Sequence, residues 1–221
     1  MTLYLIILWL LFFYLFEEYW MIQHNQSIIP SHLNLINALV PSIQDSWLKK
    51  ISLIFIGTLL LTLSAKIQVP FYPVPMTMQT FVILVIGMSF GWKLGSLTVL
   101  FYLIEGAVGL PVFAGTPIKG IGLAYMMGPT GGYLVGFLVA TCTVGYLAEK
   151  GFDRSFLTTF IAMTIGTVLI FLCGYTWISM FFGFEKAFLF GVLPFVWSEL
   201  FKVALATAVL PLCWRYLKHD S

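Results

Sequence analysis

Charge, cysteine and histidine are scarce in this sequence, and each shortage argues against a class of protein. Only 9% of the 221 residues are charged, whereas soluble domains carry about 25%, so the chain cannot cover a water-facing surface with polar groups. The three cysteines lie in apolar segments without C-x-x-C spacing, which argues against a metal or redox site. All three histidines lie outside the long apolar core runs, so histidine-dependent catalysis within a membrane is not expected.

Motifs for nucleotide and metal chemistry are missing as well. The sequence contains no G-x-x-x-x-G-K-[ST] phosphate loop and no H-E-x-x-H metal motif. Its net charge of +2 comes without a basic stripe interleaved with aromatic residues, so a nucleic-acid partner is not expected. We therefore predict a protein that is not an enzyme and has no catalytic residues, no metal site and no cofactor.

Hydrophobic residues make up 60% of the chain, and the mean hydropathy is +0.99, which indicates an integral membrane protein in a lipid bilayer. The apolar runs bounded by charges or by Pro/Gly clusters cover 2–16, 48–65, 76–90, 94–108, 131–147, 156–182 and 187–212. These runs predict an all-α membrane protein with six core transmembrane helices and an additional amino-terminal hydrophobic helix. We divide the chain into residues 1–47, the amino-terminal helix with a polar connector, and 48–221, the six-helix membrane domain.

The amino-terminal run, 2–16, has no positively charged start and no small-residue cleavage site, so a signal peptide is not expected. The run is short for a membrane span, and it fits either a seventh, tilted span or an aromatic helix lying in the interface. The polar segment 23–46 is predicted to lie over the membrane surface.

The distribution of lysine and arginine predicts the orientation. If the core begins in the cytoplasm, one side of the membrane carries Lys49, Lys50, Lys93, Lys150, Arg154, Arg215 and Lys218, and the other carries Lys66, Lys119 and Lys186. The protein is therefore expected to be a multi-pass protein of the plasma membrane with both core termini in the cytoplasm. The two Pro/Gly-rich stretches, 69–75 and 109–132, then both lie outside. Irregular backbone at membrane depth is tolerated where it lines a cavity, so we predict that they line one site.

Polar and aromatic residues in these stretches have two interpretations. Thr77 and Gln79 lie in the predicted first turn of the helix over 76–90, where they either meet a ligand or cap the helix and reach water. Phe113 and Tyr133 either stack on a ligand ring or only pack against neighbouring helices.

Glu199 and Lys202 are the ionisable pair within the last apolar run. Their i,i+3 spacing puts both side chains on one face of a helix, and in a single helix over 187–212 Lys202 falls near mid-depth. An ionisable group there costs about 2.5–3.5 kcal/mol on insertion scales, and such groups commonly mark functional sites. The pair is therefore predicted to face a ligand; the alternative is a self-neutralising pair that only fixes the rotation of its helix.

Four motifs in this order resemble the BioY family, the biotin-binding S components of energy-coupling-factor (ECF) transporters. The motifs are Pro73-Val74-Pro75-Met76-Thr77-Met78-Gln79-Thr80, Gly109-Leu110-Pro111-Val112-Phe113-Ala114-Gly115, Gly128-Pro129-Thr130-Gly131-Gly132-Tyr133-Leu134-Val135-Gly136-Phe137, and Pro194-Phe195-x-x-x-Glu199-x-x-Lys202. The resemblance runs from about residue 50 to residue 212.

The resemblance implies a six-helix S component that binds biotin with high affinity near the outer face. It also implies a transmembrane coupling protein and a pair of ATPases as partners, and these partners alone use ATP. The substrate-binding residues that it implicates are Thr77, Gln79, Phe113, Tyr133, Glu199 and Lys202.

Three positions depart from the family pattern. Glu199 stands where the family usually has Asp, the loop 116–122 is longer, and Gly57-x-x-x-Leu61-x-x-x-Ala65 replaces the A-x-x-x-A face that S components turn to the coupling protein. The alternatives are an S-component-like binder of another vitamin and a structural membrane protein whose Glu–Lys pair only orients helices.

Overall fold

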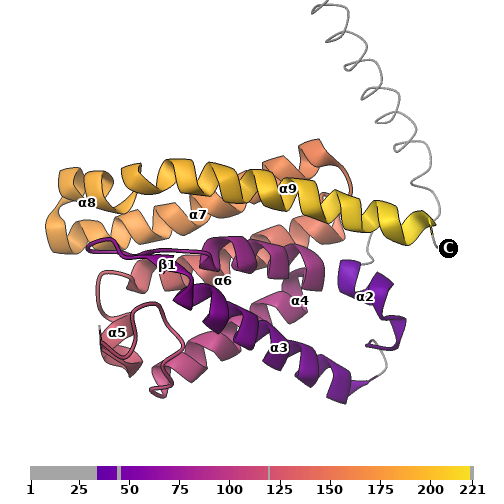
Figure 1. The fold of residues 1–221 in the computed structure, drawn as a ribbon, viewed down its shortest axis with the longest axis horizontal. Coiled ribbons are helices and arrows are strands. Elements are labelled where there is room, and N and C mark those ends of the chain that lie inside the picture. Colours follow the sequence, from indigo (N-terminus) through magenta and orange to yellow (C-terminus); the bar gives the residue numbers. More distant parts are fainter. Residues whose placement is uncertain (1–33, 44–45, 119, 220–221) are drawn as a thin grey trace, which may run out of the picture.

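The computed structural model describes residues 34–43, 46–118 and 120–219. The predicted amino-terminal helix over 2–16 and most of the connector lie outside these residues. Within them, five helical stretches are long and apolar enough to cross a membrane, and they pack side by side (Figure 1). They are α3 (Trp47–Lys66), α4 (Gln79–Ala107), α6 (Gly131–Glu149), α7 (Phe156–Phe182) and the stretch Phe184–Leu217, which contains α8 (Phe184–Gly191) and most of α9 (Val196–His219).

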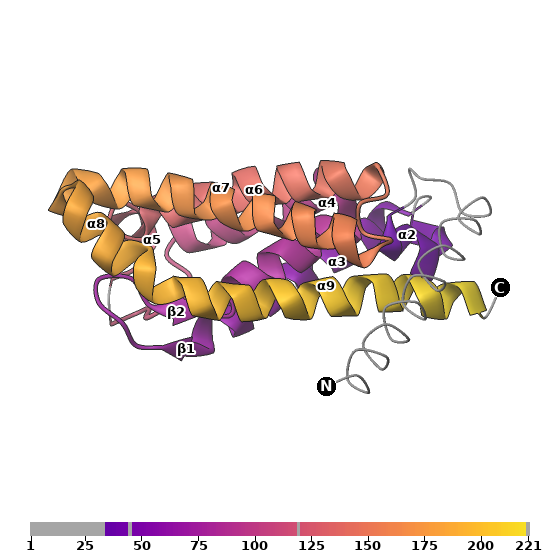
Figure 2. The same ribbon diagram turned by 90° about the horizontal axis from the view of Figure 1, so that it is seen from above.

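Short elements occupy the two ends of this bundle. At one end, next to α8, lie the helices α5 (Gly122–Met126) and η2 (Leu193–Phe195) and the antiparallel strands β1 (Gln68–Val69) and β2 (Met76–Thr77). At the other end, near the carboxyl terminus, lie α2 (Leu35–Leu39) and η1 (Pro41–Ile43) (Figure 2). The small β-ribbon is a departure from the predicted all-α fold.

Helix α4 contains a sharp reversal at Gly91, whose φ of 77° and ψ of 176° are not helical. Gln79 Nε2 donates a hydrogen bond of 2.7 Å to the Tyr102 hydroxyl, although 23 residues of straight helix would separate their backbones by about 34 Å. The two arms, 79–90 and 92–107, therefore lie against each other. They correspond to the separate apolar runs 76–90 and 94–108.

Glycines allow the helices to approach closely at the centre of the bundle. A Cβ on Gly87 would lie 2.5 Å from Val144 of α6, and one on Gly136 would lie 2.9 Å from the Ile170 Cα of α7. Gly87 also opens a G-x-S-x-G sequence that ends at Gly91, a spacing otherwise known from hydrolase nucleophiles. Here its two glycines serve packing and the helix reversal.

The Gly57-x-x-x-Leu61-x-x-x-Ala65 line of α3 faces the interior of the bundle. Leu61 and Ala65 are fully buried, and a Cβ on Gly57 would lie 2.5 Å from the Thr98 Cγ2 atom of α4. The resemblance predicts that this line faces a coupling protein, and in this structure it packs against the chain itself. Small residues serve equally for close packing within one bundle.

The predicted single helix over 187–212 is wrong. Helix α8 ends at Gly191, Val192 has non-helical φ and ψ of −120° and −60°, and Pro194 lies in η2 before α9 begins at Val196. Proline lacks the backbone N–H that an interior helix position requires, which accounts for a break here. Lys202 consequently lies in the second turn of α9, about 9 Å along the axis from its start.

Asp153 is buried in the loop between α6 and α7, where its carboxylate accepts a 2.6 Å hydrogen bond from Trp214 Nε1 of α9. The guanidinium of Arg154 lies over the same indole ring, 4.7 Å from its centroid. Burial raises the pKa of Asp153 from 3.8 to about 7, although the Trp214 hydrogen bond and the Arg154 charge lower it.

This raised pKa predicts a pH-dependent stability. Between about pH 4 and pH 7 the unfolded chain gives up the Asp153 proton while the folded chain keeps it, so the free energy of unfolding falls as the pH rises and is constant above about pH 7. We expect a loss of about 2–3 kcal/mol between pH 5 and pH 8, measured as a lower melting temperature in non-ionic detergent. Asp153→Asn should flatten this slope, whereas Glu185→Gln at an exposed site should leave it unchanged. An equal slope in Asp153→Asn would contradict this assignment.

Candidate functional site

A cavity lies at the end of the bundle that carries α5, α8 and the β-ribbon. Its walls come from the α3–α4 and α4–α6 connections, the beginnings of α4, α6 and α9, and single residues of α7 and η2. The lining residues are Val74, Pro75, Thr77, Gln79, Thr80, Phe113, Ala114, Tyr125, Thr130, Tyr133, Leu134, Phe137, Phe171, Phe195 and Glu199. Aromatic walls with a few convergent polar groups are typical of small-molecule sites.

The cavity is narrow in this structure. It contains about 510 Å³ not filled by atoms, but only about 40 Å³ in which the centre of a water-sized sphere fits. This is room for a few water molecules at most. A ligand with a ring system therefore has to push wall side chains apart as it enters.

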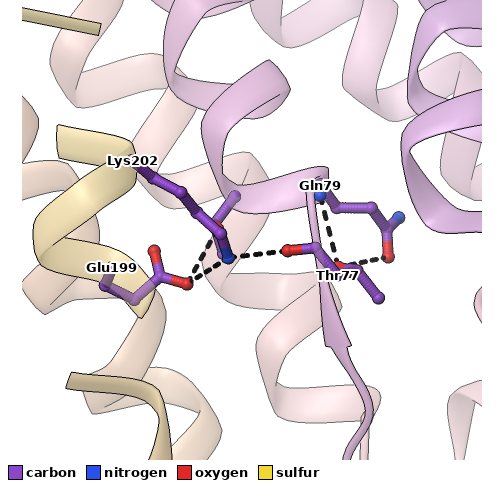
Figure 3. A network of polar contacts seen from close by, with 5 residues as sticks. Thr77, Gln79, Glu199 and Lys202 are labelled. Atoms are coloured by element: carbon purple, nitrogen blue, oxygen red, sulfur yellow. Dashed lines mark hydrogen bonds and ion pairs between the residues drawn. The ribbon is translucent and has the colours of Figure 1, made fainter. Parts of the chain in front are cut away.

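Lys202 makes three short contacts, one within α9 and two that reach β2 and the start of α4 (Figure 3). Its ammonium group lies 2.6 Å from Glu199 Oε1, 2.6 Å from the Thr77 carbonyl oxygen and 3.0 Å from Thr80 Oγ1. An ammonium group has three N–H donors, so these three acceptors use them all. Lys202 is not among the residues that line the cavity, and its predicted role in ligand binding stays a prediction.

Glu199 does line the cavity, and only one of its two oxygens is engaged. Oε1 accepts hydrogen bonds from Lys202 and from the Thr80 hydroxyl. Oε2 is buried and has no hydrogen-bond partner in the described part of the chain. A buried charged oxygen without a partner is costly, and a ligand N–H donor would remove that cost.

Thr77 and Gln79 line the cavity from β2 and from the first residue of α4. Thr77 belongs to β2 rather than to the first helical turn, so its predicted place in the helix is wrong; its hydroxyl still accepts a hydrogen bond from the Gln79 backbone N–H at 3.2 Å. The Gln79 side chain does not reach water, because it is 4% exposed. Its amide donates to the Tyr102 hydroxyl, which in turn donates to the Val112 carbonyl at 3.1 Å, so Gln79 also supports the loop that carries Phe113.

Phe113 forms a buried wall of the cavity. Its ring stacks on Tyr125 with centroids 5.1 Å apart and meets Tyr102 edge-on at 5.4 Å. Burial raises the pKa of Tyr125 above its usual value, although a hydrogen bond with Thr130 lowers it. A Cβ on Gly106 would lie 1.9 Å from the Phe113 ring, so only glycine at 106 leaves room for this wall.

Tyr133 forms the neighbouring wall and links α6 to the end of α8. Its hydroxyl donates a 2.7 Å hydrogen bond to the Gly191 carbonyl, and its ring packs over Gly174, where a Cβ would lie 2.3 Å away. Phe171 of α7 meets Tyr133 edge-on at 6.1 Å and lies 5.9 Å from Phe195. The cavity is thus closed by aromatic rings from three different elements.

Five of the six residues singled out in the sequence line this one cavity: Thr77, Gln79, Phe113, Tyr133 and Glu199. The sixth, Lys202, stands behind Glu199. Sequence reasoning missed Phe171, because it lies in a uniformly apolar run without any polar marker. It also missed Thr80 and Phe195, although both fall within the quoted motifs. The hydroxyl of Thr80, three residues after Thr77, was a signal that could have been used.

Lys66, at the end of α3, holds the loop of Phe113 from outside the cavity. Its ammonium group donates to the carbonyl oxygens of Pro111 at 2.8 Å, Phe113 at 3.0 Å and Thr116 at 3.2 Å, and to the Thr116 hydroxyl at 3.0 Å. The Lys66 side chain therefore holds the backbone of residues 111–116 in place through hydrogen bonds to its carbonyl oxygens.

Replacing Lys66 by methionine is expected to loosen this loop and to weaken ligand binding about tenfold, mainly through faster dissociation, because Phe113 is then held less firmly. The dissociation rate of the ligand is measured by stopped-flow fluorescence. Lys186→Met removes an equivalent exposed charge on α8 and should change the rate little. A dissociation rate unchanged by Lys66→Met would show that the loop needs no such anchor.

Comparison with known proteins places the chain among transporters. A model of the BioY family matches residues 34–219. The chain is 39% identical to the probable biotin transporter BioY of Pyrococcus horikoshii over 161 residues, which cover 73% of this chain and 93% of that protein. It is 37% identical to the biotin transporter BioY of Thermotoga maritima over 155 residues, covering 70% and 89%. The fold matches a crystal structure of the S component for biotin from an ECF-type ABC transporter with a TM-score of 0.65 at 24% identity, covering 76% of this chain and 92% of that one.

Proposed function

The chain belongs to the BioY family, and from this membership we propose that it is a membrane biotin-uptake protein, the biotin-binding S component of an ECF-type transporter. Its relatives include named biotin transporters. The observation that carries the proposal is Glu199, which lines a cavity with aromatic walls and whose buried Oε2 has no hydrogen-bond partner in the described chain.

The functional groups of biotin complement the residues that line this cavity. Its urea carries two N–H donors and one carbonyl acceptor, and its thioether ring is apolar. A urea N–H donates to Glu199 Oε2 in a charge-assisted hydrogen bond, and the Gln79 amide has a second N–H for the urea oxygen. The ring lies between Phe113, Tyr133 and Phe171.

Lys202 is a positioning residue in this proposal. Its three donors are occupied by Glu199, Thr77 and Thr80, so it fixes the carboxylate and does not bind the tail of biotin. The structural role considered for the ion pair thus belongs to Lys202, and the ligand-binding role belongs to Glu199.

Calorimetry on the purified full-length chain tests the proposal with three ligands. Biotin is expected to bind, biotin alkylated on the urea nitrogen is expected to lose at least about 100-fold in affinity, and biotin methyl ester is expected to lose much less. Absence of biotin binding would refute the function, and a larger loss for the ester would refute the orientation. A thermal-shift panel of other vitamins tests the alternative substrate, and a shift with another vitamin but not with biotin would favour it.

We also propose six membrane crossings, made by α3, the two arms of α4, α6, α7 and α9. The lysines and arginines near the start of α3, the turn of α4, the α6–α7 loop and the end of α9 support a cytoplasmic location for that end. The cavity then opens to the outside of the plasma membrane. Cysteine labelling of intact cells at exposed positions 69 and 150 tests this, since only position 69 should react with an impermeant reagent.

The proposed partners are a transmembrane coupling protein and a pair of ATPases. This sequence has no phosphate-binding loop, which supports a transporter in which this chain binds the vitamin and separate ATPase subunits use ATP. Because the Gly57 line of α3 is buried, the coupling protein would have to contact another face. Biotin uptake by an auxotrophic host, with and without candidate partner subunits, tests whether coupling is needed.

A further inference from the structure

A second, larger groove lies at the opposite end of the bundle from the biotin cavity. It contains about 830 Å³ in which the centre of a water-sized sphere fits. It is formed by α2, η1, the first turns of α3, the turn of α4 and the end of α6. The lining residues are Asn34, Asn37, Ile43, Trp47, Lys50, Ile51, Ile54, Phe90, Trp92, Lys93, Leu94, Leu97, Phe101 and Glu149.

The long walls of this groove are apolar and face each other from two helices. One wall follows α3 through Ile51 and Ile54, and the other follows α4 through Leu94, Leu97 and Phe101. These spacings of three or four residues keep each set on one helix face, and the walls extend about 10 Å from the mouth at 1.5 Å per residue. Ile51 and Phe101 are about half exposed, as expected of a surface that contacts acyl chains.

Two cations stand at the mouth of the groove, each beside a tryptophan. Lys50 lies 5.5 Å from the ring centroid of Trp47, and Lys93 lies 5.5 Å from that of Trp92. Tryptophan prefers the depth of the lipid headgroups, and basic pockets between transmembrane helices bind the phosphates of lipid headgroups. The mouth therefore has both the depth and the charge for a phosphate.

The same mouth contains hydrogen-bond acceptors. Glu149, at the end of α6, contributes a carboxylate to the lining. Asn34 donates its amide N–H to the Phe90 carbonyl at 3.1 Å, while its buried Oδ1 has no partner in the described residues. Because these oxygens are hydrogen-bond acceptors beside the two lysines, they would pair with a ligand that carries N–H donors close to its phosphate.

We propose that this groove binds one phosphatidylethanolamine molecule. Its phosphate lies between Lys50 and Lys93, its primary ammonium group donates to Glu149 and to Asn34 Oδ1, and one acyl chain follows the apolar walls. The pairing of two cations with one carboxylate matches a headgroup that carries a phosphate and an ammonium group. Phosphatidylcholine lacks the N–H donors, and phosphatidylglycerol lacks the positive charge.

Native mass spectrometry of the full-length chain tests this proposal. The protein is incubated in detergent with equal amounts of dioleoyl phosphatidylethanolamine, phosphatidylcholine and phosphatidylglycerol, and the retained adducts are counted. The expected result is one phosphatidylethanolamine, retained at least about fivefold more than either of the other lipids. Lys50→Gln with Lys93→Gln should reduce its retention at least fivefold, whereas Lys186→Gln at the opposite end should not.

Glu149→Gln separates recognition of the ammonium group from recognition of the phosphate. It should remove the preference for phosphatidylethanolamine over phosphatidylcholine while some lipid is still retained. Equal retention of the three lipids, a preference for phosphatidylglycerol, or an equal effect of Lys186→Gln would overturn the proposal. Retention of no lipid by the full-length chain would overturn it as well and leave the groove to residues 1–33 or to a protein partner. None of these outcomes depends on whether the chain binds biotin.

Discussion

Replacing Glu199 by glutamine is expected to weaken biotin binding by about 100-fold or more while leaving the protein folded. Lys202 keeps an oxygen acceptor at the Oε1 position, so the new amide turns its NH₂ group toward the cavity. A donor then faces the urea N–H groups, and both the charge-assisted hydrogen bond and its acceptor are lost, which amounts to about 3 kcal/mol. Calorimetry measures the loss.

The matched control for this variant is Glu105→Gln. Glu105 lies in α4 and does not line the biotin cavity, so its neutralisation should change the affinity less than about threefold. The melting temperature of Glu199→Gln should fall by several degrees, because the buried Lys202 ammonium group loses its counter-charge while keeping its three acceptors, so binding is measured well below that temperature. Unchanged biotin affinity in Glu199→Gln would mean that the urea is recognised elsewhere.

Replacing Lys202 by methionine is expected to lower the free energy of unfolding by about 3–5 kcal/mol. Among the described residues, the buried Glu199 carboxylate then keeps Thr80 as its one donor, and the Thr77 carbonyl loses its hydrogen bond of 2.6 Å. The expected fall in melting temperature is about 10 °C, and biotin binding should be lost with it. Thermal denaturation in detergent, with and without biotin, measures both effects.

A second variant separates the roles of the two charges. Lys202→Met combined with Glu199→Leu removes the uncompensated carboxylate, so it should regain most of the stability without regaining biotin binding. Lys186→Met serves as the control for loss of a lysine. If Lys202→Met melts like the wild type but does not bind biotin, the lysine contacts the ligand directly and our assignment of it as a positioning residue is wrong.

The sequence predicts the bundle well where local patterns determine the structure. Helices α3, α6 and α7 lie within a few residues of their apolar runs, because about 20 apolar residues in lipid can only satisfy their backbone groups as a helix. The same reasoning failed over 187–212, where hydropathy stays high through Pro194 and hides the break between α8 and α9. It also placed Thr77 in a helix, since a two-residue strand leaves no periodic signal.

The site could be predicted as a set of residues but not as an arrangement. Four short motifs contain 13 of the 15 residues that line the cavity, and five of these were singled out because polar and aromatic side chains beside Pro and Gly stand out in an apolar sequence. The sequence could not show that Lys202 points at a backbone carbonyl 125 residues away, nor that Glu199 alone faces the cavity. These facts depend on how α9 docks against α4, which is a tertiary property.

The contact between Lys202 and Thr77 has a consequence for biosynthesis. Thr77 leaves the ribosome well before Lys202, which lies 125 residues later in the chain. Until α9 has been inserted, the cavity lacks the Glu199 carboxylate, and Thr77 and Thr80 lack the Lys202 ammonium group that contacts them. The proposed biotin site therefore forms only after α9 has joined α4, and a chain that stops before α9 is expected not to bind the vitamin.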